Sequence, residues 1–263
     1  MSQTDSANQV SNLKHLVDRY QRLRPTQFKL NNKLVTLLDT DVLNECGRRL
    51  GMLRGGVFYF DDEDQSSVLM DYCIYNGTRR GRNAVEQYLV DNPPDDDSDE
   101  MTCLRAMQRA TYTLLAVLEV VPGVGCRVHD LFTDETRLLI DLGLSMSAVR
   151  GLVVATRLLD HGEYVTTGGA ALPFAELDDA KMEAFQRKMR QGIPDANFDP
   201  AVLIRKALQS SPRIAYKDST GSVPARSPGE RSRALEARRA GKKAANRRCR
   251  CGSGKMYKNC CGK

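Results

Sequence analysis

Four cysteines lie within the last fifteen residues of this 263-residue chain, in the run CRCGSGKMYKNCCGK that begins at Cys249. Two of the thiols are one residue apart, eight residues follow, and the other two thiols are adjacent. Four sulfur ligands on two short arms suit a tetrahedral ion, for which Zn²⁺ is the usual choice. We therefore expect one bound divalent cation to organise the C-terminus.

Disulfide bonds account for this spacing less well. Consecutive Cα atoms are ~3.8 Å apart, which is below the ~4.4 Å at which relaxed disulfide bridges begin. A bridge between Cys260 and Cys261 would therefore be strained. Cross-pairs of these two residues with Cys249 or Cys251 remain open as an alternative to zinc.

The segment 247–263 also carries a family resemblance. Its Cys-Arg-Cys-Gly-Ser-Gly-Lys, Tyr-Lys and Cys-Cys-Gly steps resemble the SEC-C motif, the zinc knuckle that ends the SecA preprotein translocase ATPase. In SecA the knuckle contacts the chaperone SecB and the ribosome, so the resemblance implies a portable binding element. It implies four zinc ligands, which are Cys249, Cys251, Cys260 and Cys261. Cys261 stands where many members have histidine, and Met256 stands where a basic residue is more common.

The Gly-Ser-Gly-Lys step inside this segment is not a phosphate loop. A Walker A loop needs a glycine five residues before Gly254 and a serine or threonine after Lys255. Cys249 and Met256 occupy those two positions, and no other stretch supplies the pattern. The sequence therefore excludes a SecA-type motor. The glycines instead allow a tight turn that aims backbone N–H groups at thiolate sulfur.

The net charge of +6 is unevenly distributed along the chain. From Lys217 to Lys263, fourteen lysines and arginines stand against three acidic residues, a net charge of +11, so the first 216 residues carry −5. A basic tail on an acidic body predicts contact with an acidic protein surface or another polyanion. The alternatives are a solvated tail and cations that keep the thiolates ionised. The residues expected to meet a partner are Arg247, Arg248, Arg250, Lys255, Tyr257 and Lys258.

Residues 10–111 are predicted to form a mainly helical region. Apolar residues recur at helical spacing from Val10 to Tyr20, with Pro25 beyond the end, and again from Lys33 to Leu50, with Gly51 as a stop. A short strand at 57–60 and two brief helices, at 68–74 and 84–89, are expected to follow.

The acidic run DNPPDDDSDE at 91–100 is predicted to be a loop. A metal site at Asp95–Asp97 is conceivable, but the run lacks the glycine and the spaced oxygen ligands of a calcium loop. Acids placed just before Met101 favour the start of a helix, because they complement its positive end. We expect that helix to reach about Thr111.

Between residues 112 and 174 short runs of branched and apolar residues alternate with turn signals. Short strands at this pitch suit a small barrel that closes on itself and so has no exposed edges. The pattern resembles an SH3-like barrel, and similar segments precede SEC-C knuckles in other bacterial proteins. Arg127, Arg137 and Arg157 lie in these strands, as part of a binding face or of a structural scaffold. The five predicted strands are 114–121, 126–130, 137–140, 152–158 and 163–166.

The rest of the chain is predicted to be a helical extension at 175–209, with helices at 178–189 and 201–208, then a linker and basic helix at 210–246. The basic helix carries one large apolar residue, Leu235, and therefore cannot pack into a core. The predicted fold class is α+β. A helical N-terminal region precedes a small SH3-like β-barrel, and the linker and basic helix end in the zinc knuckle at 247–263.

An enzyme is the less favoured class, because acid–base chemistry usually needs a histidine or a carboxylate pair in a cleft. The three histidines are His15, His129 and His161, and a Cys126/His129 dyad, which spacing alone does not exclude, has no orienting Asn or Asp that the sequence identifies. Cys126 and His129 are three residues apart in a strand and should face opposite sides. We predict a non-enzymatic zinc-binding adaptor that docks on a SecB-like chaperone or on the ribosome. The alternative is a sequence-independent nucleic-acid-binding protein.

The expected location is the cytoplasm. The N-terminus has neither a basic start nor an apolar stretch, and no run approaches eighteen apolar residues. The four cysteines outside the C-terminal segment are widely scattered in apolar surroundings, as buried free thiols usually are. These residues are Cys46, Cys73, Cys103 and Cys126.

Overall fold

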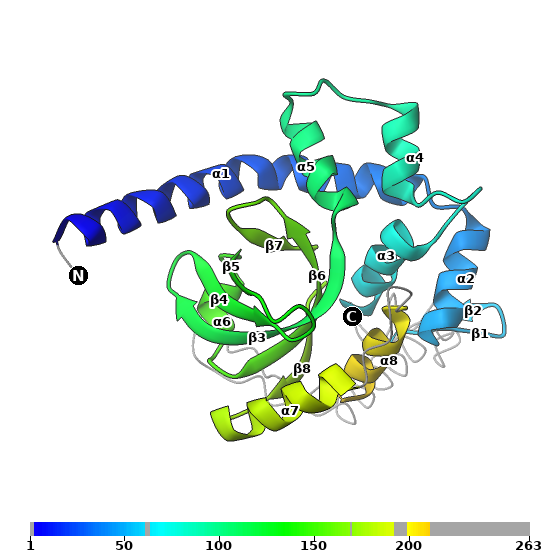
Figure 1. Cartoon of the computed structure of the whole chain (residues 1–263). Coiled ribbons are helices and arrows are strands. Elements are labelled where there is room, and N and C mark those ends of the chain that lie inside the picture. The colour runs from blue at the N-terminus through cyan, green and yellow to red at the C-terminus, as the bar shows by residue number, and fades with distance from the viewer. Residues whose placement is uncertain (1–2, 61–63, 169, 192–198, 211–263) are drawn as a thin grey trace, which may run out of the picture. The chain divides into compact units, whose positions relative to one another are not determined.

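The computed structural model describes residues 3–60, 64–168, 170–191 and 199–210 (Figure 1). Within these residues the chain is α+β, with N-terminal helices followed by a barrel of strands, as the sequence predicts. Contacts within the chain divide it into two units, residues 1–214 and 215–263. The predicted basic helix and the C-terminal zinc knuckle at 247–263 lie outside the described residues.

The first helix, α1 (Gln3–Thr36), is longer than predicted and continues through Pro25. Its buried residues Leu16 and Tyr20 pack against the barrel, and Leu23, Leu30 and Leu34 pack against the other helices. This continuous buried stripe stabilises the helix on both sides of the proline, so tertiary packing overrides the local stop signal. In Figure 1, α1 runs along one side of the barrel and continues past α5 and α4.

The helix predicted at 33–50 is interrupted in the structure. Its first residues belong to α1, which ends at Thr36, and α2 (Thr40–Leu50) begins after a break that was not predicted. Asp39 is the N-cap of α2, and its Oδ1 accepts a hydrogen bond of 2.9 Å from the Val42 N–H. At the other end Gly51 adopts φ +76° and stops the helix, as predicted.

A small hairpin, β1 (Leu53–Arg54) and β2 (Val57–Phe58), follows α2. The predicted strand at 57–60 is thus confirmed in its first half. Three further helices are α3 (Asp64–Asn76), α4 (Ala84–Asp91) and α5 (Asp99–Gln108). The predicted helix start before Met101 is confirmed, since Ser98 caps α5 and two acids occupy its first turn.

The five predicted strands form a closed barrel. Its strands are β3 (Thr111–Val121), β4 (Gly125–Asp130), β5 (Thr136–Ile140), β6 (Leu152–Asp160) and β7 (Val165–Thr167). Their order is β3-β4-β5-β7-β6, and pairing of β3 with β6 closes the barrel. The short α6 (Leu144–Ser147) lies between β5 and β6.

A sixth strand, β8 (Leu172–Glu176), pairs with β6 and was not predicted. Pro173 lies within it and suggests a break, but an edge strand tolerates proline because one side of the strand makes no ladder bonds. Two helices follow, α7 (Asp179–Gln191) and α8 (Ala201–Ser210), close to their predicted ranges.

The helices and the barrel share a hydrophobic core. One cluster joins Leu50 of α2, Tyr72 of α3, Leu114 of β3, Val153 of β6 and Ile204 of α8. Figure 1 shows α3 and α8 on the same side of the barrel. Among the described helices, none has an apolar stretch of sufficient length to cross a membrane.

Candidate functional site

The residues predicted to bind zinc or a partner all lie outside the described part of the chain. This holds for the four cysteines, Cys249, Cys251, Cys260 and Cys261, and for Arg247, Arg248, Arg250, Lys255, Tyr257 and Lys258. Where the chain is described, no group of three or more His, Cys, Asp or Glu residues is placed to hold a metal ion. The site that the structure does present is a pocket beneath an arginine-rich turn between α3 and α4.

This arginine turn consists of residues Arg79–Arg82. The backbones of Arg79 and Arg82 exchange two hydrogen bonds, of 2.8 and 3.1 Å, and form a small antiparallel bridge. The two residues between them, Arg80 and Gly81, have φ +52° and +79°, the sign pattern of a type I′ turn. Glycine and asparagine are the residues usually found there, and a left-handed arginine costs about 1–2 kcal/mol.

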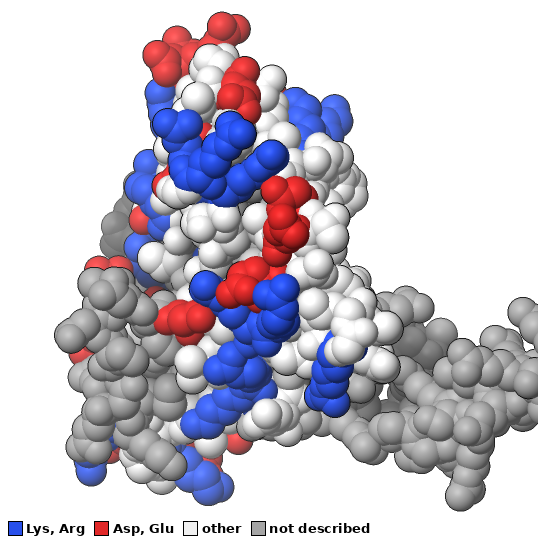
Figure 2. Space-filling view, turned by 90° about the vertical axis from the view of Figure 1, so that its right-hand side faces the viewer, with Lys and Arg blue, Asp and Glu red and all other residues white. Residues whose placement is uncertain are grey.

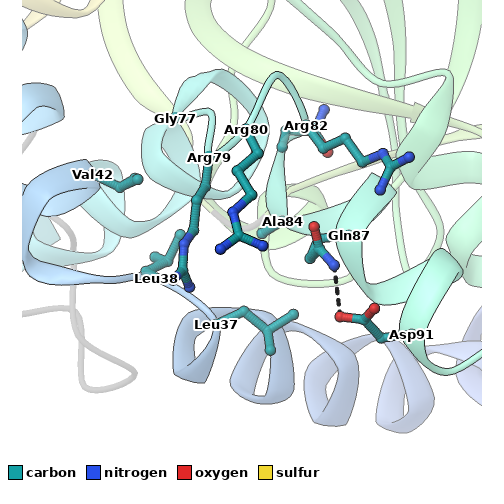
Figure 3. Close-up of a pocket in the computed structure, with 11 residues that line it drawn as sticks. Leu37, Leu38, Val42, Gly77, Arg79, Arg80, Arg82, Ala84, Gln87 and Asp91 are labelled. Carbon is teal, nitrogen blue, oxygen red and sulfur yellow. Dashed lines mark hydrogen bonds between the residues drawn. The ribbon is translucent and has the colours of Figure 1, made fainter.

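The pocket has a volume of about 340 Å³. Figure 3 shows the side chains of Arg79 and Arg80 running from the turn toward Leu37 and Leu38, whereas Arg82 points away from them. The lining combines cationic, amide, carboxylate and aliphatic groups. Its members are Leu37, Leu38, Val42, Gly77, Arg79, Arg80, Arg82, Asn83, Ala84, Gln87 and Asp91.

The charges around the pocket are only partly paired. Arg79 Nε lies 3.2 Å from Oδ2 of Asp39, so the N-cap of α2 also holds one arginine of the turn. Gln87 Nε2 donates a 2.7 Å hydrogen bond to Asp91 Oδ2, one turn further along α4 (Figure 3). Among the described residues, no ion pair or hydrogen bond engages the guanidinium of Arg80. The same holds for Arg82 in the described chain, but its side chain points away from Leu37 and Leu38, so Arg80 is the unpaired cation directed at them (Figure 3).

Gly77 lets the pocket walls approach each other. A Cβ at this position would lie 2.5 Å from Val42 Cγ1 and 2.7 Å from the Cys73 carbonyl oxygen. Any larger residue would push α2 away from the end of α3.

The face that carries α2 and the end of α3 is mixed in charge. Figure 2 shows its lysines and arginines in separate groups, with aspartates and glutamates between them. On α2, for example, Glu45 pairs with both Arg48 and Arg49 at 2.6 and 3.0 Å. A broad cationic surface of the kind that follows a nucleic-acid backbone is therefore not what this face offers.

The arginines, amides and aliphatic groups of the pocket suit binding. A guanidinium stays protonated in proteins and binds carboxylates and phosphates through fixed N–H donors. Amides and aliphatic side chains add orientation and apolar contact, but they exchange no protons near neutral pH. The geometry suits recognition of an anion.

Arginines in the barrel strands were predicted to be part of either a binding face or a structural scaffold. In the structure they do not form a shared binding face. Arg137 pairs with Asp160 at 2.7 Å, and Arg157 is buried. Arg127 instead lies on a shallow depression beside Leu118 and Glu119. Each arginine thus has a separate environment.

Cys126 and His129 face opposite sides of β4, as predicted. Cys126 belongs to the barrel core, where burial raises the pKa of its thiol to about 11. His129 Nε2 lies 3.0 Å from Asp134 Oδ1 and also contacts Gln186 of α7. The two side chains therefore do not form a nucleophile–base pair.

The structure contains a buried ion pair, Asp71–Arg157, that was not predicted from the sequence. Arg157 Nε donates a 3.0 Å hydrogen bond to Asp71 Oδ2, and its Nη2 donates a 2.8 Å bond to Asn76 Oδ1. The guanidinium also lies over the ring of Tyr75 at 4.1 Å. Both charged residues are less than a tenth exposed. The signal was present in the sequence, since each stands alone as a charge within an apolar run, VLMDYCI and LVVATRLL.

His161 gives the fold a predicted pH dependence. Burial, reinforced by the nearby charge of Arg19, lowers the pKa of His161 from 6.5 to about 4. The folded state therefore resists protonation, and stability is lost as pH falls from about 6.5 to 4, by roughly 3 kcal/mol in total. We expect urea denaturation of His161→Phe to lack this loss relative to the native protein. His15→Phe, at an exposed position of α1, should keep it; equal pH profiles for all three proteins would contradict the prediction.

Comparison with known proteins identifies a family without an assigned activity. The description "Family of unknown function (DUF7986)" matches residues 14–199, most of the chain, and the chain belongs to this family. No curated protein and no solved structure matches. The assignment to the SEC-C motif family is therefore wrong, since the matching family is a different one and the described residues hold no zinc site. The cysteine run lies outside the matched region, and so short a segment does not define the family of the whole chain.

Proposed function

We propose that this protein is a non-enzymatic adaptor that docks on an acidic protein partner through its basic C-terminal tail. The observation that carries the proposal is the separation of charge, with +11 on residues 217–263 and −5 on the residues before them. Opposite potentials steer association and select the partner. The barrel and helices serve as the scaffold in this proposal, and the barrel is taken as SH3-like from its five short closed strands.

Three acids of the body's acidic loop already have basic partners within the body. In the acidic loop at 91–100, Asp96 pairs with Arg105 at 2.8 Å. Asp99 and Glu100 are approached by Arg22 and Lys33, at 3.5 and 3.0 Å. These pairings support an external partner for the tail charge.

Zinc at Cys249, Cys251, Cys260 and Cys261 is the second part of the proposal. A bound ion would fix the tip of the tail, so that less conformational entropy is lost on docking. The four other cysteines are free and buried, which suits a reducing compartment, and we place the protein in the cytoplasm on that ground.

The test is affinity capture with the full chain and with the full-length double variant Cys249→Ser/Cys260→Ser. We expect about one zinc per native chain by elemental analysis, and capture of an acidic protein that the variant no longer retains. A purified SecB-like chaperone and purified ribosomes are the first two partners to test.

Two outcomes would refute the proposal. The first is unchanged capture by the variant that lacks two thiols. The second is retention on nucleic acid with a steep loss of affinity as salt rises, which would favour the nucleic-acid-binding alternative. Arg48→Ser, on α2 in the body, is the matched control and should leave capture unchanged.

A further inference from the structure

The pocket beneath the arginine turn is lined by residues between Leu37 and Asp91. We propose that it binds a small carboxylic acid with an apolar body. Its volume of about 340 Å³ lies within the range of small-molecule sites. Its lining provides both a cation for the carboxylate and an aliphatic floor for the rest of the ligand.

The charge of the pocket selects a monoanion. Arg79 shares its charge with Asp39, and Arg82 points away from the other two arginines (Figure 3). Within the described chain neither Arg80 nor Arg82 has an ion pair, so Arg80 is the unpaired cation whose side chain runs toward the leucines of the lining, and Asp91 adds a negative charge. A carboxylate matches a single guanidinium in charge and in bidentate geometry. A phosphate dianion would bring a second charge toward Asp91.

The floor of the pocket selects an apolar body. Leu37, Leu38, Val42 and Ala84 line it. An aliphatic chain placed on these side chains would leave water while its carboxylate stays at the turn.

The backbone of Arg80 points to the same use. A left-handed arginine is strained where asparagine or glycine would fit, and such strain is found mainly where a side chain has a function. Arg80 is exposed, and within the described chain its guanidinium has no ion-pair or hydrogen-bond partner. A ligand in the pocket would give this strained residue a function.

The experiment is titration of the full-length protein with hexanoate, followed by backbone amide NMR shifts. We expect saturable shifts at Leu38, Gly81 and Asn83, around the pocket. Arg80→Asn should weaken hexanoate binding at least about tenfold, because it removes a charge-assisted hydrogen bond. Its thermal midpoint should not fall, because asparagine relieves the strained φ. Arg54→Asn, an exposed arginine of the β1–β2 hairpin, should bind as the native protein does.

Three ligand comparisons complete the test. Hexanol and inorganic phosphate should each bind at least about tenfold more weakly than hexanoate, since one lacks the charge and the other the apolar body. Leu37→Ala should weaken hexanoate but not acetate. The Cys249→Ser/Cys260→Ser variant should bind hexanoate normally, which separates this site from the proposed tail function.

Any of four results would overturn the assignment. These are undiminished hexanoate binding by Arg80→Asn, equal affinity for hexanol, equal affinity for phosphate, and shifts that map away from the pocket. Loss of hexanoate binding in the cysteine variant would assign the site to the tail instead.

Discussion

Arg157→Leu and Asp71→Asn are each expected to lower the free energy of unfolding by about 3–5 kcal/mol. The first leaves the carboxyl of Asp71 without its partner in the core, and the second leaves the guanidinium of Arg157 without a counter-charge. The two residues join α3 to the barrel strand β6 through a 3.0 Å hydrogen bond between buried side chains. Urea denaturation at pH 7 measures the loss. The matched control is Arg105→Leu, whose partner Asp96 is exposed, and we expect a loss of at most about 1 kcal/mol there. Similar losses for the buried and the exposed pair would contradict the prediction.

The two variants should differ in their response to pH. Burial raises the pKa of Asp71 even with Arg157 beside it, and removal of the arginine takes away its only lowering influence. In Arg157→Leu the folded state therefore binds a proton more readily than the unfolded state. Its stability should recover as pH falls through the raised pKa of Asp71 toward the ordinary value near 4. Asp71→Asn should show no such recovery, because the guanidinium of Arg157 cannot release its proton.

A double variant tests whether the ion pair adds to the free energy of unfolding or mainly favours this fold over alternative packings. Replacement of both Asp71 and Arg157 by leucine removes the buried charges together. Buried ion pairs exchanged for apolar residues are often neutral in stability, so the double variant should regain most of the loss seen in the single variants. The rings of Tyr75 and Tyr112, over which the guanidinium lies at 4.1 and 5.4 Å, would then contact aliphatic carbon.

The barrel could be predicted from the sequence because its signals are local. Five runs of branched residues, each ended by glycine, proline or aspartate turns, correspond to β3 to β7 within a few residues. The missed strand β8 contains Pro173, whose meaning depends on whether the strand is central or at an edge. That is a tertiary property, and no local pattern reveals it.

The helical region was harder to predict for the same reason. Pro25 usually ends a helix, but the buried stripe from Leu16 to Leu34 holds α1 together across it. At Asp39 the sequence predicted too long a helix rather than too short a one. Apolar residues spaced in fours suggested a single helix across this position, whereas Asp39 is the N-cap at which α2 begins. Long-range packing decided the first case, and a side-chain hydrogen bond decided the second.

The candidate site was not predicted at all. Three arginines in the run TRRGRN suggest only an exposed turn, since nothing in the sequence places them beside Leu37 and Leu38. The pocket arises because Gly77 brings α2 and α3 together and Asp39 holds Arg79.

Gly151→Ala is expected to destabilise the protein by about 3 kcal/mol or more, because two separate penalties combine at this residue. Its φ is +86°, and an added Cβ would lie 2.1 Å from the carbonyl oxygen of Leu177. That oxygen belongs to the backbone and cannot rotate away. The residue also joins three strands, since its N–H donates to the Val117 carbonyl at 2.8 Å and its own carbonyl accepts from the Leu177 N–H at 2.9 Å.

Gly123→Ala separates the two penalties. Gly123 has φ +73°, but nothing lies within 4 Å of an added Cβ, so its variant should lose only about 1 kcal/mol from backbone strain. The difference between the two variants in urea denaturation measures the clash with Leu177, the residue that follows β8. Because the clash lies where the start of β6 meets both β3 and the end of β8, it should also open the barrel seam, and amide hydrogen exchange should rise at residue 151 and at Leu177 in Gly151→Ala alone. Equal stability losses, or unchanged exchange at these amides, would show that β8 moves aside without cost and that the barrel closes without its support.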